Sequence, residues 1–137
     1  MRHSRHSSCS YGTYRRADDS FDYVHVGWPA LLKHQRTFAA CDDGGLAEGY
    51  SDAIVRLLAH RWDQFGTFVA ISKRHPEFQR WAIQHIDATT SDDDLKKVEL
   101  NAAYCADNVK TRVLCKAIHG AAESARTALS QTLAKSR

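Results

Sequence analysis

The sequence lacks several features that would place it in a common class of proteins. It has no run of 18 apolar residues, so we expect no transmembrane helix and no membrane partner. Its N-terminus lacks the apolar core of a secretory signal. It also contains no nucleophile elbow, no phosphate-binding glycine loop and no metalloprotease motif. We therefore expect no cofactor, and an enzyme is the less favoured interpretation.

Paired cysteine motifs are missing as well. The four cysteines, at positions 9, 41, 105 and 115, form no CxxC pair and match no zinc-finger spacing. Without a secretory signal we predict a cytoplasmic, reducing compartment and free thiols. Cys105 and Cys115 stand on or beside apolar stripes, which favours buried packing residues. A disulfide between these two cysteines is the open alternative.

The composition is nevertheless sufficient for one core. Of the 137 residues, 43% are hydrophobic and 26% are charged, both near the globular average. The net charge of +3 is mildly basic and falls below the balance expected of a dedicated nucleic-acid-binding domain. We predict a single helical domain over residues 21–137, preceded by a flexible basic tail over residues 1–20 that contains almost no aliphatic residues.

Apolar residues recur at steps of three and four from residue 28 onward, which indicates helices. Before them, residues 21–26 are rich in aromatic and β-branched residues but have no good strand partner, so an extended segment is expected. The fold class predicted is all-α, a bundle of four or five helices with short loops and an extended N-terminal segment. The expected helices cover residues 29–42, residues 46–73 with a bend at Gly66, residues 77–87, a segment beginning at residue 92, and residues 108–135.

Local signals set the predicted boundaries. Pro76 separates the second helix from the third, and Ser91 opens a variant capping box with an acidic residue three positions later. The apolar register then continues without a slip, so residues 92–135 would suit one long helix. We favour a corner at Asp107 and Asn108, with Asp107 as the N-cap of the last helix, because a helix of that length is too long for so small a chain.

Histidine is abundant, with eight residues, and three of them, His60, His75 and His85, lie near a predicted aromatic cluster. His60 and Asp63 would supply an acid–base pair on one helix face, although the same pattern is typical of a solvated face. Trp62 and Trp81 are predicted to pack in the core across the turn at Pro76, with His85 on the same apolar stripe as Trp81. The candidate pocket consists of His60, Asp63, Trp62, Trp81 and His85, and a packed core hinge is the plainer interpretation.

The N-terminus carries one constellation with definite chemistry. The Met1 amine, two backbone amides and the His3 ring would enclose Cu(II) or Ni(II) in a square-planar site. Any chain with histidine in the third position has this capacity, so the motif by itself implies no biological use.

The preferred function is that of a small, non-enzymatic helical protein of bacterial type, which acts by contact with another protein or by self-association. The first alternative is a nucleic-acid-associated regulator that uses the basic tail and helix 108–135, where Lys110 and Arg112 would open a recognition helix. The second alternative is a ligand- or metal-binding protein or enzyme with a histidine-containing pocket. Salt separates the first two, since nucleic-acid binding weakens steeply with salt and apolar docking does not.

Overall fold

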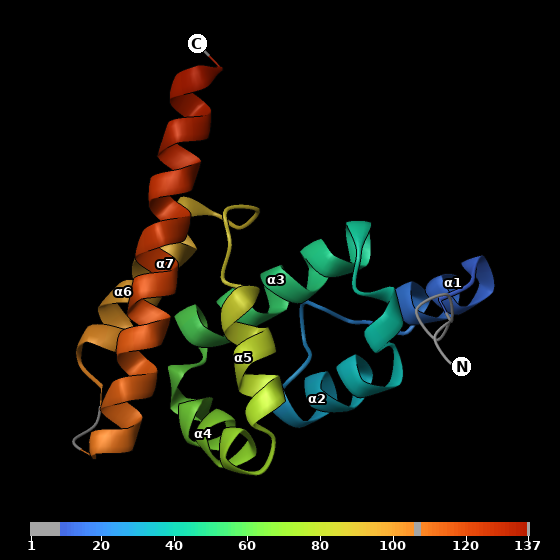
Figure 1. The fold of residues 1–137 in the computed structure, drawn as a ribbon, viewed down its shortest axis with the longest axis horizontal. Helices are drawn as coiled ribbons and strands as arrows, with labels where there is room; N and C mark the ends of the chain where they lie inside the picture. The colour runs from blue at the N-terminus through green and yellow to red at the C-terminus, as the bar shows by residue number, and fades with distance from the viewer. Residues whose placement is uncertain (1–8, 106–107, 137) are drawn as a thin grey trace, which may run out of the picture.

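The computed structural model describes residues 9–105 and 108–136, and the regular structure of these residues is helical throughout, with no strand. The helices follow one another through short connections (Figure 1). The predicted all-α class is confirmed. The elements are α1 (Tyr11–Asp19), α2 (Trp28–Thr37), the 3-10 turn η2 (Ala39–Cys41), α3 (Gly44–His60), the 3-10 turn η3 (Trp62–Gln64), α4 (Phe65–Arg74), α5 (Pro76–Gln84), α6 (Asp92–Ala103) and α7 (Val109–Lys135).

Helix α1 lies inside the segment that the sequence predicts to be a flexible tail. Ser10 caps it, because the Ser10 side chain accepts a hydrogen bond from the backbone N–H of Thr13 at 3.1 Å. Ala17 is completely buried and belongs to the core. The structure therefore departs from the prediction over residues 9–20, while residues 1–8 lie outside the described residues. A helix with so few aliphatic residues gives almost no periodic signal.

His34 of α2 attaches α1 to the rest of the molecule. Its Nε2 donates to the backbone carbonyl of Ala17 at 2.9 Å, and its Nδ1 lies 2.7 Å from the hydroxyl of Tyr50 on α3. With the Tyr50 hydroxyl as donor, both ring nitrogens are satisfied in the neutral form. Burial lowers the pKa of His34, which favours the same neutral form. Phe21, from the non-helical segment between α1 and α2, packs its ring against His34 and Tyr50.

The segment predicted as one helix over residues 46–73 forms two helices, α3 and α4. The chain leaves the helical conformation at Arg61, where φ is −130° and ψ is 47°, and Gly66 lies inside α4. Trp62 and Phe65, which follow the break, continue the apolar spacing of α3. In the structure their rings stack on each other, with centroids 4.2 Å apart. The periodicity therefore could not locate the break.

Helices α6 and α7 pack as a hairpin, which confirms the predicted corner. Ser91 caps α6 as expected, but α7 is capped by Asn108, whose Oδ1 accepts from the backbone N–H of Thr111 at 3.1 Å. The predicted cap, Asp107, lies outside the described residues. The 12 residues of α6 span about 18 Å and the 27 residues of α7 span about 40 Å, so α6 covers only part of its partner. Accordingly, the C-terminal end of α7 projects beyond the other helices (Figure 1).

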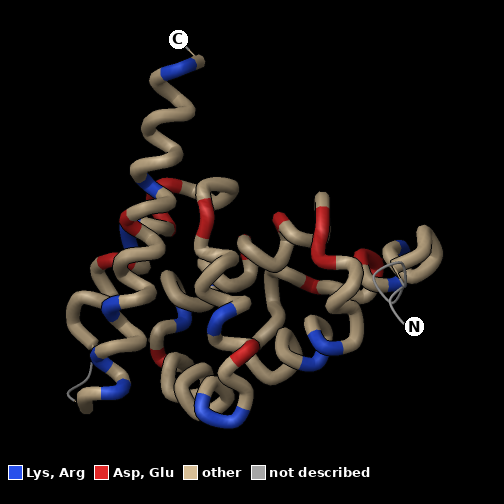
Figure 2. The backbone as a smooth tube through the Cα atoms, viewed as in Figure 1, with Lys and Arg blue, Asp and Glu red and all other residues tan. Residues whose placement is uncertain are grey.

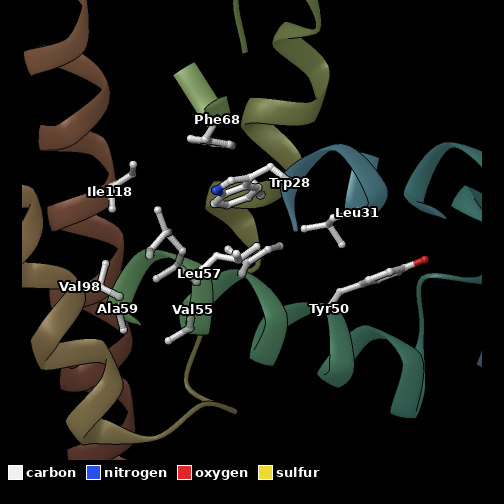
Figure 3. Packing of buried hydrophobic residues seen from close by; sticks show 14 of the residues in the cluster. Trp28, Leu31, Tyr50, Val55, Leu57, Ala59, Phe68, Val98 and Ile118 are labelled. Carbon is white, nitrogen blue, oxygen red and sulfur yellow. The ribbon is translucent and has the colours of Figure 1, made fainter. Parts of the chain in front are cut away.

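The core is centred on Trp28, which packs between Phe68 of α4 and Phe78 of α5 at ring-centroid distances of 4.3 and 6.4 Å. Figure 3 shows Trp28 facing Phe68, with side chains of α3, α6 and α7 closing the cluster. Trp62 and Trp81 were predicted to be core residues, but both are only partly buried at the edge of this cluster. The buried tryptophan is thus the one that opens α2.

Two disulfides replace the free thiols that the sequence predicts. Cys9 is bonded to Cys41, which joins the start of α1 to η2, and Cys105 is bonded to Cys115 across the α6–α7 corner. The Cα atoms are 5.1 and 6.2 Å apart, within the range of such bonds. The expectation of reduced Cys105 and Cys115 is therefore wrong in this structure, because the hairpin brings the two residues together.

Candidate functional site

The predicted acid–base pair of His60 and Asp63 does not form. His60 Nε2 lies 2.8 Å from Asp94 Oδ1 of α6, and Asp63 pairs with the neighbouring Arg61 at 3.0 Å. His60 and Asp94 border a cavity of about 330 Å³, together with Asp52. Burial, and then the negative charge of nearby carboxylates, raises the pKa of Asp52. The cavity offers two carboxylates and a histidine, with no activated nucleophile beside them.

Two other predicted pocket residues, Trp81 and His85, do come together at a carboxylate that sequence reasoning missed. Asp42 Oδ2 accepts from Trp81 Nε1 at 2.7 Å and lies 2.9 Å from His85 Nε2. On the other side of the ring, His85 Nδ1 lies 2.7 Å from Ser51 Oγ, which donates to Asp87 Oδ2 at 2.9 Å. This polar network connects the residue that ends η2, helix α3, helix α5 and the loop after α5.

The network contains serine, histidine and aspartate in contact, but its proton arrangement does not activate the serine. The hydroxyl proton of Ser51 goes to Asp87, so the Ser51 oxygen must accept from Nδ1 of His85. Nε2 must donate as well, because its partner Asp42 is a carboxylate. Because the Ser51 hydroxyl donates its proton to Asp87, His85 is not placed to remove that proton as a base.

Burial and charge support a structural role for this network. Ser51 is 1% exposed, which denies a substrate access to its hydroxyl. Burial alone would raise the pKa of Asp42, but the hydrogen bonds from His85 and Trp81 lower it below its ordinary value. Asp42 is therefore ionised in the folded protein. The network holds the first half of α3 against the end of α5.

A cavity lies between the end of α6 and the first half of α7. This feature, the α6–α7 groove, has a volume of about 740 Å³. The end of α6, the Cys105–Cys115 disulfide and the first half of α7 form its walls. Its lining consists of Ala102, Ala103, Cys105, Val109, Arg112, Val113, Cys115, Lys116, His119, Gly120 and Glu123.

Large apolar side chains are exposed in and around this groove. Val109 and Val113 are 65% and 64% exposed, and Tyr104, the residue that ends α6, is 85% exposed. The sequence pattern assigned Val109 and Val113 to the apolar stripe of the last helix together with buried Leu114 and Ile118. The apolar stripe of α7 is wider than the part of its surface that the other helices cover. The periodicity of the sequence therefore could not separate the buried residues of the stripe from the exposed ones.

Charge is not gathered on one face of the molecule. Figure 2 shows Lys and Arg spread over α2, α4, α6 and α7. Arg15 and Arg16 lie on α1, at the end of the molecule opposite α7 (Figure 1), so the described part of the predicted basic tail does not extend the surface of α7. The α6–α7 groove is lined by two cationic residues, Arg112 and Lys116, by His119 and by one carboxylate, Glu123.

The described residues contain no group of three or more His, Cys, Asp or Glu side chains that could hold a metal ion. The predicted copper site at Met1 and His3 lies outside the described residues and stays a prediction. No helix within residues 9–105 and 108–136 is long and apolar enough to cross a membrane. Comparison of the chain with protein-family models, curated proteins and solved structures finds no match.

Proposed function

We propose that the protein is a non-enzymatic docking module that binds an acidic, amphipathic segment of another protein in the α6–α7 groove. The observation that carries this proposal is the concentration of exposed apolar side chains at one end of the molecule. Half of the large hydrophobic side chains that are exposed in the described residues belong to this end: Leu100, Tyr104, Val109 and Val113. Exposed apolar patches of this kind mark interaction surfaces.

The form of the groove favours a helical segment as its occupant. One wall is the long helix α7, and the exposed residues Val109, Val113 and Lys116 follow one another at steps of three and four along it. A partner helix that lies along such a wall presents apolar anchors at the same spacing. The Cys105–Cys115 disulfide lines the groove and fixes the corner between its walls, which lowers the entropy that docking would otherwise cost.

The charges at the groove select the chemistry of the partner. Lys116 and His119 stand one turn apart on α7, and Glu123 is the acidic residue of the lining. A segment with acidic residues beside its apolar anchors would be attracted by this surface, and a basic segment would be repelled. The buried network at His85 does not compete with this interpretation, because its serine is inaccessible and carries no activated hydroxyl.

The experiment is site-specific photo-crosslinking in the cells that express the protein. A photoreactive residue replaces Val113 in the groove or, as a matched control, Val24, which is 50% exposed in the segment between α1 and α2. We expect Val113, and not Val24, to crosslink to one protein segment, and peptide mapping to show that this segment is acidic and amphipathic. Crosslinks to nucleic acid, to a second copy of this chain or to a basic segment would overturn the proposal, as would equal labelling at Val24.

The two disulfides bear on the cellular compartment of the protein. A cytoplasmic location is what the sequence predicts, whereas disulfide bonds persist in oxidising compartments. Alkylation of protein from freshly lysed cells, followed by mass spectrometry, counts the free thiols. Four free thiols would support the cytoplasmic location, and none would place the protein in an oxidising compartment with its groove held by Cys105 and Cys115.

A further inference from the structure

The apolar stripe of α7 continues beyond the point where α6 covers it. Along the covered part of the helix, buried residues recur at steps of three and four: Cys115, Ile118, Ala122 and Ala125. Leu129 and Leu133 extend this spacing on the same face, and Leu133 is 56% exposed. An apolar stripe that runs past its helical partner is a packing surface without a cover.

The cover over this stripe ends at Arg126. The Arg126 guanidinium binds Asp92, the first residue of α6, and Glu99, each at 3.0 Å. From residue 127 to Lys135, α7 continues for about 14 Å and projects beyond the other helices (Figure 1). A second helix that ran antiparallel to α7, as α6 does, would lie on the same face of α7 and in line with α6.

The charges at the two ends of this projecting segment are opposite. Residues 127–134 contain no charged side chain, and Lys135 makes the tip positive. Figure 2 shows the projecting end of α7 without charge up to its tip. At its base, in the first turn of α6, Asp93 is exposed and forms no ion pair with another described residue. A surface with a cation at one end and an unpaired carboxylate at the other complements a second copy of itself that is turned around.

We propose that two copies of this chain associate through the projecting ends of α7, packed antiparallel about a twofold axis at Gln131. Leu129 of each copy then lies opposite Leu133 of the other, because these two residues are equally far from Gln131. Lys135 of each copy reaches the level of residue 127, next to the first turn of the other copy's α6, where Asp93 stands. A parallel pair is excluded by space, since the second α7 would run into the position that α6 fills.

The length of the overlap sets the strength of this contact. About 14 Å of helix buries less than the roughly 800 Å² per partner of a standard interface, so the dimer is weak and forms at high protein concentration. The leucines supply the attraction, and the pairs of Lys135 with Asp93 fix the direction. The α6–α7 groove stays open in this dimer, because Val113 lies about 27 Å along the helix axis from Gln131.

Sedimentation velocity of the full chain over a wide range of protein concentration tests the contact. We expect the wild type to shift from monomer to dimer, and Leu133→Ser to weaken the dimer about tenfold or more, because each dimer loses two leucines. Leu100→Ser is the matched control, since Leu100 lies on α6 and is 51% exposed, and it should leave the dimer unchanged. A monomer at every concentration, an equal loss in both variants, or assemblies larger than a dimer would overturn the proposal.

Charge reversal tests the antiparallel direction. Lys135→Glu alone and Asp93→Lys alone should each weaken the dimer about threefold, the scale of exposed ion pairs, with circular dichroism confirming that the helices are intact. Both changes in one chain should restore the dimer, because the reversed tip of each copy then meets the reversed residue of the other. A merely local effect on α6 or α7 would add up in the double variant instead, and this result would contradict the proposed pairing.

Discussion

Replacement of Asp42 by asparagine should destabilise the protein far more than the loss of a surface charge would. Asp42 Oδ2 receives hydrogen bonds from His85 Nε2 and Trp81 Nε1, and the side chains of Asp42 and His85 are only 22% and 11% exposed. Hydrogen bonds to a charged group contribute about 1.5–3 kcal/mol and neutral ones about 1 kcal/mol. Asparagine keeps the shape of the aspartate side chain but removes the negative charge that accepts the hydrogen bonds from His85 and Trp81. We therefore expect the free energy of unfolding to fall by about 2–3 kcal/mol at pH 7.

The assay is urea denaturation of the disulfide-intact protein, with Asp93→Asn as the matched control. Asp93 is exposed in the first turn of α6, where a carboxylate contributes about 0.3–1 kcal/mol through the helix dipole. The pKa of Asp42 lies below its ordinary value of 3.8 in the folded state. A carboxylate with a depressed folded pKa stabilises above that ordinary value and loses its contribution as pH falls through the folded pKa. The difference between wild type and Asp42→Asn should therefore shrink below pH 3.8.

The reasoning would be refuted if Asp42→Asn and Asp93→Asn had equal effects at pH 7. It would also be refuted if the difference between wild type and Asp42→Asn stayed constant through the acid range. Either result would mean that His85 and Trp81 do not depend on this carboxylate in solution.

Three further predictions concern the first part of the chain. Replacing Cys9 and Cys41 together by serine should lower the free energy of unfolding by about 3–4 kcal/mol, since their sequence separation is 32 residues, and calorimetry under oxidising conditions measures it. Burial lowers the pKa of His34 from 6.5, so the contacts of His34 should stabilise the fold above pH 6.5 and lose this effect as the pH falls below it. The rate of amide hydrogen exchange in α1 should therefore rise on acidification in wild type, and rise less in His34→Gln. With a free Met1 amine, one Cu(II) should bind with a visible square-planar band that His3→Ala abolishes, and a band that persists in this variant would contradict the assignment.

Local signals in the sequence predicted much of the fold, because they act within a few residues. Ser91 caps α6 and Pro76 opens α5, as their chemistry requires. The break at Arg61 was missed, because Trp62 and Phe65, which follow it, continue the helical spacing of α3. A stacked aromatic pair just after a helix break looks the same in sequence as a pair on one continuous helix.

The candidate sites depended on distant contacts, and sequence patterns do not report these. Asp42 and Ser51 meet His85 from 43 and 34 positions away. The exposure of Val113 follows from the width of the apolar stripe of α7, which exceeds the strip that the other helices cover. Cys9 and Cys41 become neighbours only after α1 packs, and the absence of a secretory signal pointed to free thiols instead.

The most direct test of the docking proposal is the affinity of the crosslinked segment, made as a synthetic peptide, for three forms of the protein. Isothermal titration calorimetry compares wild type with Val113→Asp in the α6–α7 groove and with Val24→Asp as the control at a similarly exposed valine. The proposal predicts that Val113→Asp weakens binding at least tenfold and that Val24→Asp leaves it unchanged, with only a modest loss of affinity as salt screens the charges of the groove. Equal affinity for all three forms, or an affinity that collapses with salt as nucleic-acid binding does, would contradict the assignment of the groove as an apolar docking site.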